Sequence, residues 1–144
     1  MKADSVTIET VIHASVELVW KAWTEPDLIL KWFGSDPRGR GLKAQVDPRP
    51  GGTFEISFCN SDGTEYNCHG RYAEVEKLEK LAFTWEWKNE PGVESFVTIL
   101  LTPENNHTRM QFEHARVGSK SAHNYLEGWE STFGKLDRLL SGNL

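Results

Sequence analysis

Residues 20–33 read WKAWTEPDLILKWF and carry three tryptophans and a phenylalanine. Within them, Thr24-Glu25-Pro26 predicts the start of a helix that ends by Phe33-Gly34, because proline fits an early helical position. Upstream, Ser15 can cap an earlier helix over about 15–23. Two short helices with this much aromatic surface are typical of a wall or lid over something apolar. The apolar stripe of the second helix is expected to be Leu28, Trp32 and Phe33.

Strands are predicted on both sides of this helical pair. Apolar and polar residues alternate over about 6–12, which indicates a first strand. The same period of two recurs in six later segments, where Leu42 shares the phase of Ala44 and Val46, and Gly70 suggests a bulge or bend. These six segments are about 42–46, 53–59, 65–76, 81–87, 94–102 and 107–115.

The last segment follows the helical repeat of i, i+3, i+4 and i+7. Ser119 or Ser121 can cap this helix, and Gly142 can end it. The order of elements predicts an α+β fold with a curved antiparallel sheet of about seven strands wrapped round the long C-terminal helix. Such an arrangement would leave a cavity between sheet and helix. The helical repeat consists of Ala122, Tyr125, Leu126, Trp129, Phe133, Leu136 and Leu140.

Chain length, net charge and the distribution of apolar residues restrict the possible classes of function. A length of 144 residues favours a single domain over residues 1–144. The formal net charge of -5 provides no basic surplus to displace counterions, so we expect no nucleic-acid partner. No segment approaches the ~20 apolar residues of a membrane helix, and the N-terminus lacks the apolar core of a signal peptide. We therefore expect no membrane span and a cytoplasmic location.

Four motifs, in this order and spacing, resemble a known family. They are WTEPDLILKWF (23–33), DPRPGGTFEI (47–56), GRYAEVEKLEKLAFTWEW (70–87) and GWESTFGKLDRLL (128–140). Over about residues 6–140 the chain resembles the bacterial branch related to the activator of the ninety-kilodalton heat-shock protein ATPase. That branch belongs to the START-like (SRPBCC) superfamily. The resemblance implies a helix-grip fold, with the two short helices between the first two strands supporting one end of the sheet.

The superfamily hosts several activities. It includes lipid and hormone carriers, polyketide cyclases and aromatases, oxygenase subunits and the co-chaperone domain. The co-chaperone has a further N-terminal domain that binds the chaperone, whereas this chain begins directly with its first predicted strand. The resemblance therefore implies ligand binding ahead of chaperone activation.

The hairpin between the third and fourth strands holds both cysteines. Cys59 and Cys68 lie several rungs apart in any short-loop register, beyond the ~7 Å between Cα atoms that a disulfide allows, so we expect both to be reduced. The loop length also decides which face carries Tyr66 and Cys68, because a slip of one residue inverts every side chain. An even-numbered loop places them with Glu55, and an odd-numbered loop places them with Ile56 and Phe58.

Acid–base chemistry has two candidate residues, His114 and Tyr66. His114 shares the strand phase of Met110 and Phe112, so it should face the cavity side, where a histidine can act as a general base. The alternative is a polar residue near a strand end, bonded to backbone or water. The five histidines show no metal-ligand spacing, and we expect neither a metal nor a cofactor.

In a helix-grip arrangement, aromatic faces of the strands and the last helix meet across the gap between them. Plain core packing explains most of these residues, and the rest are expected to line a pocket whose polar tips are Tyr125, Trp129 and His114. The expected lining is Trp32, Phe33, Phe54, Ile56, Phe58, Trp85, Trp87, Met110, Phe112, His114, Tyr125, Trp129 and Phe133.

Three functions follow as hypotheses. The leading one is a non-catalytic protein, monomer or homodimer, that binds a small hydrophobic or aromatic molecule in the cavity. The second is an enzyme of the cyclase, dehydratase or hydrolase type that acts on an aromatic or polyketide-like substrate. The third is a protein-interaction module that stimulates a heat-shock ATPase.

Overall fold

The computed structural model describes residues 5–117 and 122–141. Within them, seven strands form an antiparallel sheet in the order β1-β7-β6-β5-β4-β3-β2. The strands are β1 (Val6–Ile12), β2 (Arg40–Val46), β3 (Thr53–Cys59), β4 (Glu65–Glu76), β5 (Lys80–Trp87), β6 (Glu94–Glu104) and β7 (His107–Ala115).

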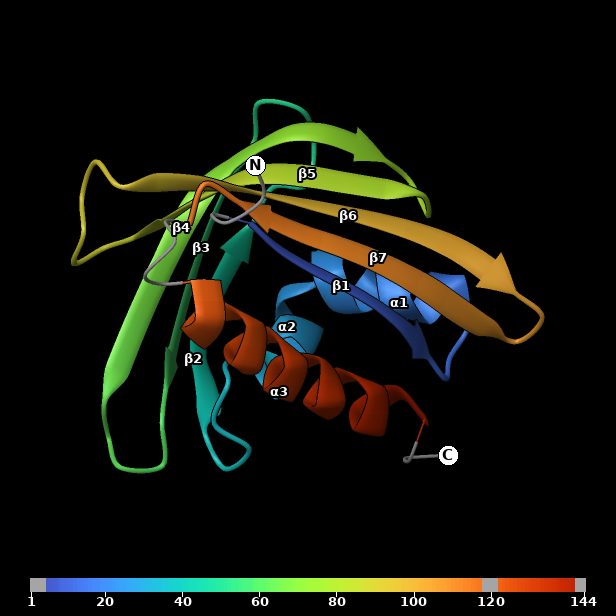
Figure 1. Cartoon of the computed structure of the whole chain (residues 1–144), viewed down its shortest axis with the longest axis horizontal. Helices are drawn as coiled ribbons and strands as arrows, with labels where there is room; N and C mark the ends of the chain where they lie inside the picture. Colours follow the sequence, from blue (N-terminus) through green and yellow to red (C-terminus); the bar gives the residue numbers. More distant parts are fainter. Residues whose placement is uncertain (1–4, 118–121, 142–144) are drawn as a thin grey trace.

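Three helices lie on the concave side of the sheet (Figure 1). They are α1 (Val16–Thr24) and α2 (Pro26–Trp32), which connect β1 to β2, and the long α3 (Ala122–Ser141). The Oγ of Ser15 accepts a hydrogen bond from the backbone N–H of Leu18, and Pro26 opens α2, as the sequence predicts. The expected caps of α3, Ser119 or Ser121 and Gly142, lie outside the described residues, as does the side chain of Ala122.

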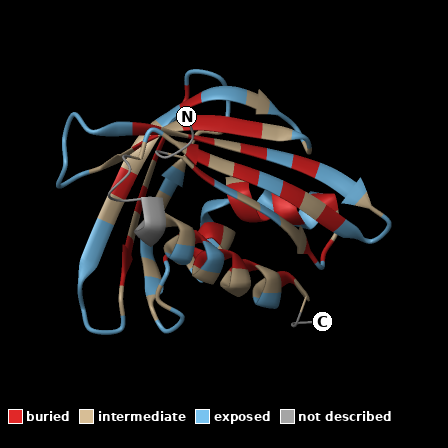
Figure 2. Ribbon diagram, in the orientation of Figure 1, coloured by how far each residue is buried: buried red, intermediate tan, exposed pale blue. Residues whose placement is uncertain are grey.

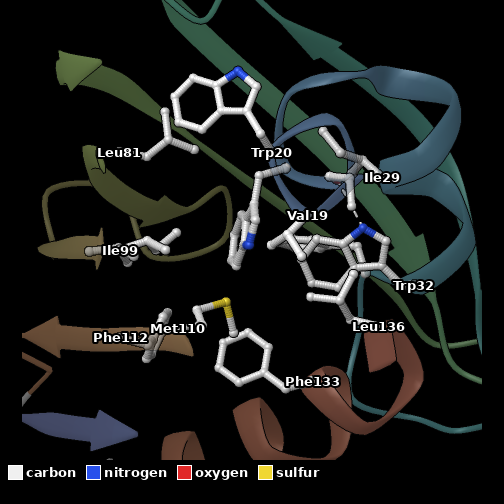
Figure 3. Close-up of a cluster of buried hydrophobic side chains, with 14 of the residues drawn as sticks. Val19, Trp20, Ile29, Trp32, Leu81, Ile99, Met110, Phe112, Phe133 and Leu136 are labelled. Carbon is white, nitrogen blue, oxygen red and sulfur yellow. Dashed lines mark hydrogen bonds between the residues drawn. The ribbon is translucent and has the colours of Figure 1, made fainter. Parts of the chain in front are cut away.

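The core fills the space between the sheet and the helices. Figure 2 shows buried positions alternating with intermediate or exposed ones along β6 and β7, which is the period expected of strands with one covered face. Figure 3 shows Trp20 and Trp32 of the helical pair in one buried cluster that also includes the strand residues Ile99 and Met110, and Leu136 of α3. Most of the aromatic surface in residues 20–33 is therefore structural.

Three local expectations from the sequence are wrong. Leu42 is 39% exposed, because the pairing of β2 with β3 shifts between Gly41 and Lys43 and breaks the alternation. In α2, Ile29 is buried, whereas Leu28 is only half-buried. The sixth strand continues to Glu104, two residues beyond the expected end at 102, so the turn falls at Asn105 and Asn106.

The hairpin of β3 and β4 has the odd-numbered loop. Cys59 pairs with Glu65, which leaves the five residues 60–64 in the loop. Phe58 consequently lies opposite Tyr66, and Ile56 opposite Cys68, so these four side chains share the concave face of the sheet. Both cysteines are free, as predicted.

Candidate functional site

A pocket of about 460 Å³ lies between the sheet and α3. It is partly open to solvent, and its wall is mostly aromatic. The strands contribute Phe58, Tyr66, Trp85 and Trp87; α3 contributes Tyr125, Gly128, Trp129 and Thr132; the segment after α2 contributes Phe33, Gly34 and Ser35; and the turn after β5 contributes Asn89 and Glu90.

The strand side of this pocket follows from the sheet register. Trp85 and Trp87 are two residues apart on β5, so they share a face, and Trp87 pairs with Cys68 of β4. The rings of Phe58 and Tyr66 stack with centroids 5.5 Å apart, and the Trp87 centroid lies about 6 Å from each of them. Three neighbouring strands therefore form a continuous aromatic floor.

The segment that closes the side of the pocket is fastened to α3. The Nζ of Lys135 donates hydrogen bonds to the carbonyl oxygens of Gly34 (3.0 Å) and Asp36 (2.9 Å), and Ser131 Oγ donates to the Ser35 carbonyl (2.6 Å). The Asp36 carboxylate in turn accepts bonds from the backbone and side chain of Ser61. The bond from the Ser61 backbone, followed by one from the Arg38 backbone and that from the Ser61 side chain, lowers the pKa of Asp36 to about 2.

A small group of polar atoms lies within the aromatic wall. Trp87 Nε1 donates a hydrogen bond of 2.7 Å to the phenol oxygen of Tyr125. Burial raises the pKa of Tyr125, while the bond from Trp87 opposes that rise and the charge of Glu90 adds to it. The nearby Trp85 N–H also lowers the pKa of Tyr125. It does not form a hydrogen bond of proper geometry, so this buried donor has no partner among the described residues. Tyr125 thus stays a protonated phenol at neutral pH.

His114 lies fully buried behind this group. Trp129 Nε1 donates to His114 Nδ1 (3.0 Å), so the ring hydrogen of the neutral histidine belongs on Nε2, which donates to Ser95 Oγ (2.7 Å). Ser95 Oγ can pass the chain on to the carbonyl oxygen of Trp85 (3.3 Å). Burial lowers the pKa of His114 to about 3. A neutral ring with both nitrogens engaged links β7, β6 and α3.

The structure distributes the other expected lining residues away from this pocket. Trp32 is fully buried, with its Nε1 bonded to the Ala22 carbonyl (3.0 Å). Phe54 and Ile56 line an inner cavity of about 20 Å³, room for about one water molecule. Phe33 and Trp85 line both cavities, so they form the shared wall. Met110, Phe112 and Phe133 belong to the hydrophobic core.

Several residues of the pocket wall were not predicted from the sequence. Gly34, Ser35, Asn89, Glu90, Gly128 and Thr132 line the wall but carry no periodic signal of their own. Gly128 and Thr132 lie one turn apart on α3, and Gly128 is one turn from Tyr125, so the helical repeat could have indicated them. The described residues 5–117 and 122–141 contain no group of three metal-ligating side chains, and none of their helices is long and apolar enough to cross a membrane.

The fold and the placement of the pocket define the class of protein. An antiparallel sheet curved round a long C-terminal helix, with two short helices after the first strand, is a helix-grip α+β architecture. Residues 13–141 match the model of the family described as Activator of Hsp90 ATPase homolog 1-like protein. The chain belongs to that family.

Solved structures are similar along nearly the whole chain. A protein from Nitrosomonas europaea is 26% identical with a TM-score of 0.83, and the match covers 99% of this chain and 97% of that one. A protein from Mesorhizobium loti is 26% identical with a TM-score of 0.75, covering 97% and 98%. An AHSA1-like protein from Aeromonas hydrophila is 23% identical with a TM-score of 0.82, covering 96% and 92%. A search of curated proteins gave no significant match.

Proposed function

We propose that this protein binds a small, largely apolar aromatic molecule in the pocket between the sheet and α3. The observation that carries the proposal is the wall itself, in which seven aromatic side chains surround about 460 Å³. Ligand sites are concave, lined by apolar and aromatic side chains, and usually between about 300 and 1,000 Å³. The polar groups of the wall include the phenol of Tyr125, which is held by the Trp87 N–H and can orient a ligand.

Binding has more support than catalysis. A general base needs a free lone pair and a pKa near the working pH. His114 has both ring nitrogens engaged and a pKa lowered to about 3 by burial. Tyr66 lies on the pocket floor with 37% of its surface exposed, and among the described residues it has ring contacts but no hydrogen-bonded acid–base partner. Interaction with an Hsp90-type ATPase rests on the family description alone.

The test uses equilibrium dialysis against a panel of neutral two-ring aromatic compounds and lipids, with bound ligand measured by chromatography. Gly128 lies on the pocket wall, and a Cβ there would meet only the Ser35 Cβ at 3.6 Å, so Gly128→Leu projects a side chain beside the pocket. Gly134→Leu, on the same helix but outside the pocket, is the matched control.

We expect the wild-type protein to retain at least one aromatic compound. Gly128→Leu should weaken that binding about tenfold or more, because it fills ligand volume, and Gly134→Leu should leave it within about twofold. Unfolding curves would confirm that both variants fold. Failure of the wild-type protein to retain any compound would refute the proposal, and so would equal binding by the two variants.

A further inference from the structure

The donor group at Tyr125 indicates which ligand chemistry the pocket would take. The phenol oxygen of Tyr125 already accepts the Trp87 N–H at 2.7 Å, so the phenol's own hydrogen must seek a different acceptor. None of the described residues accepts it, and the nearby Trp85 N–H is buried without a partner among them. A buried donor without an acceptor is costly, so a ligand oxygen beside Tyr125 would remove that cost for Trp85 and would give the partly buried phenol an acceptor.

The hydrogen bond that the Tyr125 phenol accepts makes the phenol a stronger donor. When Trp87 donates to the Tyr125 oxygen, it polarises the O–H bond and makes the phenol a better donor. Since burial also holds the phenol protonated, Tyr125 can donate throughout the neutral pH range. The geometry therefore provides a strong donor on an otherwise aromatic wall.

The charges around the pocket oppose an anionic ligand. Glu90 is the one charged side chain among the described residues of the lining. Lys135 of α3, which holds the segment at residues 34–36, directs its Nζ to the carbonyl oxygens of Gly34 and Asp36 rather than to the pocket. A carboxylate ligand would thus lose its hydration without gaining a counter-charge, and would face repulsion from Glu90.

We propose that the pocket selects neutral aromatic molecules of about two fused rings that carry a carbonyl oxygen, which accepts the hydrogen of Tyr125. This inference rests on the proposed function and specifies its ligand class. The size follows from volume, because an apolar cavity of about 150 Å³ holds benzene and this pocket has about 460 Å³ with part of it open to solvent.

Equilibrium dialysis with three naphthalene probes of similar shape separates the effects of a carbonyl oxygen, of its absence and of a negative charge. The probes are 2-acetylnaphthalene, 2-ethylnaphthalene and 2-naphthoate. Tyr125→Phe removes the donor and keeps the ring. Tyr72→Phe is the matched control, because it removes a tyrosine hydroxyl at a position that does not line this pocket. Glu90→Gln removes the charge.

Tyr125→Phe should weaken 2-acetylnaphthalene binding about tenfold, which is the size of one net hydrogen bond, and leave 2-ethylnaphthalene within about twofold. Tyr72→Phe should leave the binding of both compounds within that range. The wild-type protein should bind 2-naphthoate more weakly than the ketone, and Glu90→Gln should reduce this difference in affinity. Independently of any variant, the infrared carbonyl stretch of the ketone bound to wild-type protein should move to lower frequency.

Equal losses for the ketone and the hydrocarbon in Tyr125→Phe would overturn the inference. An unshifted carbonyl stretch, or 2-naphthoate binding as tightly as the ketone, would overturn it too. In each of these cases the neutral probes still bind, so the proposed function stands. Absence of binding by all three probes and by the wider panel would instead refute the proposed function, and the inference with it.

Discussion

His114 is the residue whose role changes most between sequence and structure. The alternation of β7 places it correctly on the concave side, with Met110 and Phe112. Its partners, Ser95 and Trp129, come from β6 and α3 and lie 19 and 15 residues away in sequence. Such long-range partners follow from tertiary packing, so alternation alone could not indicate whether the ring faces a reaction or joins two elements.

The buried histidine should make stability depend on pH. Folding lowers the pKa of His114 from 6.5 to about 3, so the unfolded chain binds more protons between these values. The free energy of unfolding should therefore have its highest value above pH 6.5. It should fall by up to about 1.4 kcal/mol per pH unit as the pH drops below that value. Denaturant unfolding at a series of pH values from 7 to 4.5 measures this slope.

His114→Gln should flatten that slope, whereas replacing the exposed His107 with glutamine should preserve it. Asp36 contributes only at lower pH, because its pKa falls from 3.8 to about 2 on folding. Identical slopes for wild type and His114→Gln would show that the histidine is accessible to protons in the folded state.

At the scale of the elements, periodic signals predict strands and helices well but predict their pairing poorly. The bounds of β1, β4, β7 and α3 lie within a residue or two of the expected ones. The parity of the loop at residues 60–64 and the shift beside Gly41 depend on backbone hydrogen bonds that leave no mark in the alternation. These two features decide that Tyr66 faces the pocket and that Leu42 does not join the core.

Gly70 shows why one strand needs a glycine. A Cβ built there would overlap the carbonyl oxygen of Thr84 on β5 and lie 2.8 Å from the ring of Phe54. Gly70→Ala must push β4 from β5, which should cost about 3 kcal/mol or more of stability. The pairing shift itself falls two residues later, between Tyr72 and Glu74.

Gly134→Ala is the control for this effect, since a Cβ on that face of α3 meets only the flexible Arg138 side chain at 3.4 Å. Alanine should stabilise the helix by about 0.5–1 kcal/mol. Urea denaturation of the two variants should thus give changes of opposite sign. A neutral Gly70→Ala would mean that β4 and β5 tolerate a wider separation than the structure indicates.

Across the whole molecule, the aromatic residues divide into a sealed core and an open pocket. The stretch at residues 20–33 supplies Trp20, Trp23 and Trp32 to the core and only Phe33 to the pocket wall. Composition and periodicity predict that both groups are buried by the sheet and helices. Which rings meet and which leave a gap depends on the fastening of residues 34–36 to α3, and the sequence shows no pattern for those bonds.

The measurement that tests the binding pocket most directly is a titration of ¹⁵N-labelled protein with 2-acetylnaphthalene, followed by the indole N–H resonances. The chain has six tryptophans, each with one such signal, and Trp→Phe variants assign them. The signals of Trp85 and Trp87 on the pocket wall should shift and saturate, whereas that of Trp32, bonded to Ala22 in the core, should stay in place. Unmoved Trp85 and Trp87 signals, or an equal shift at Trp32, would contradict the account.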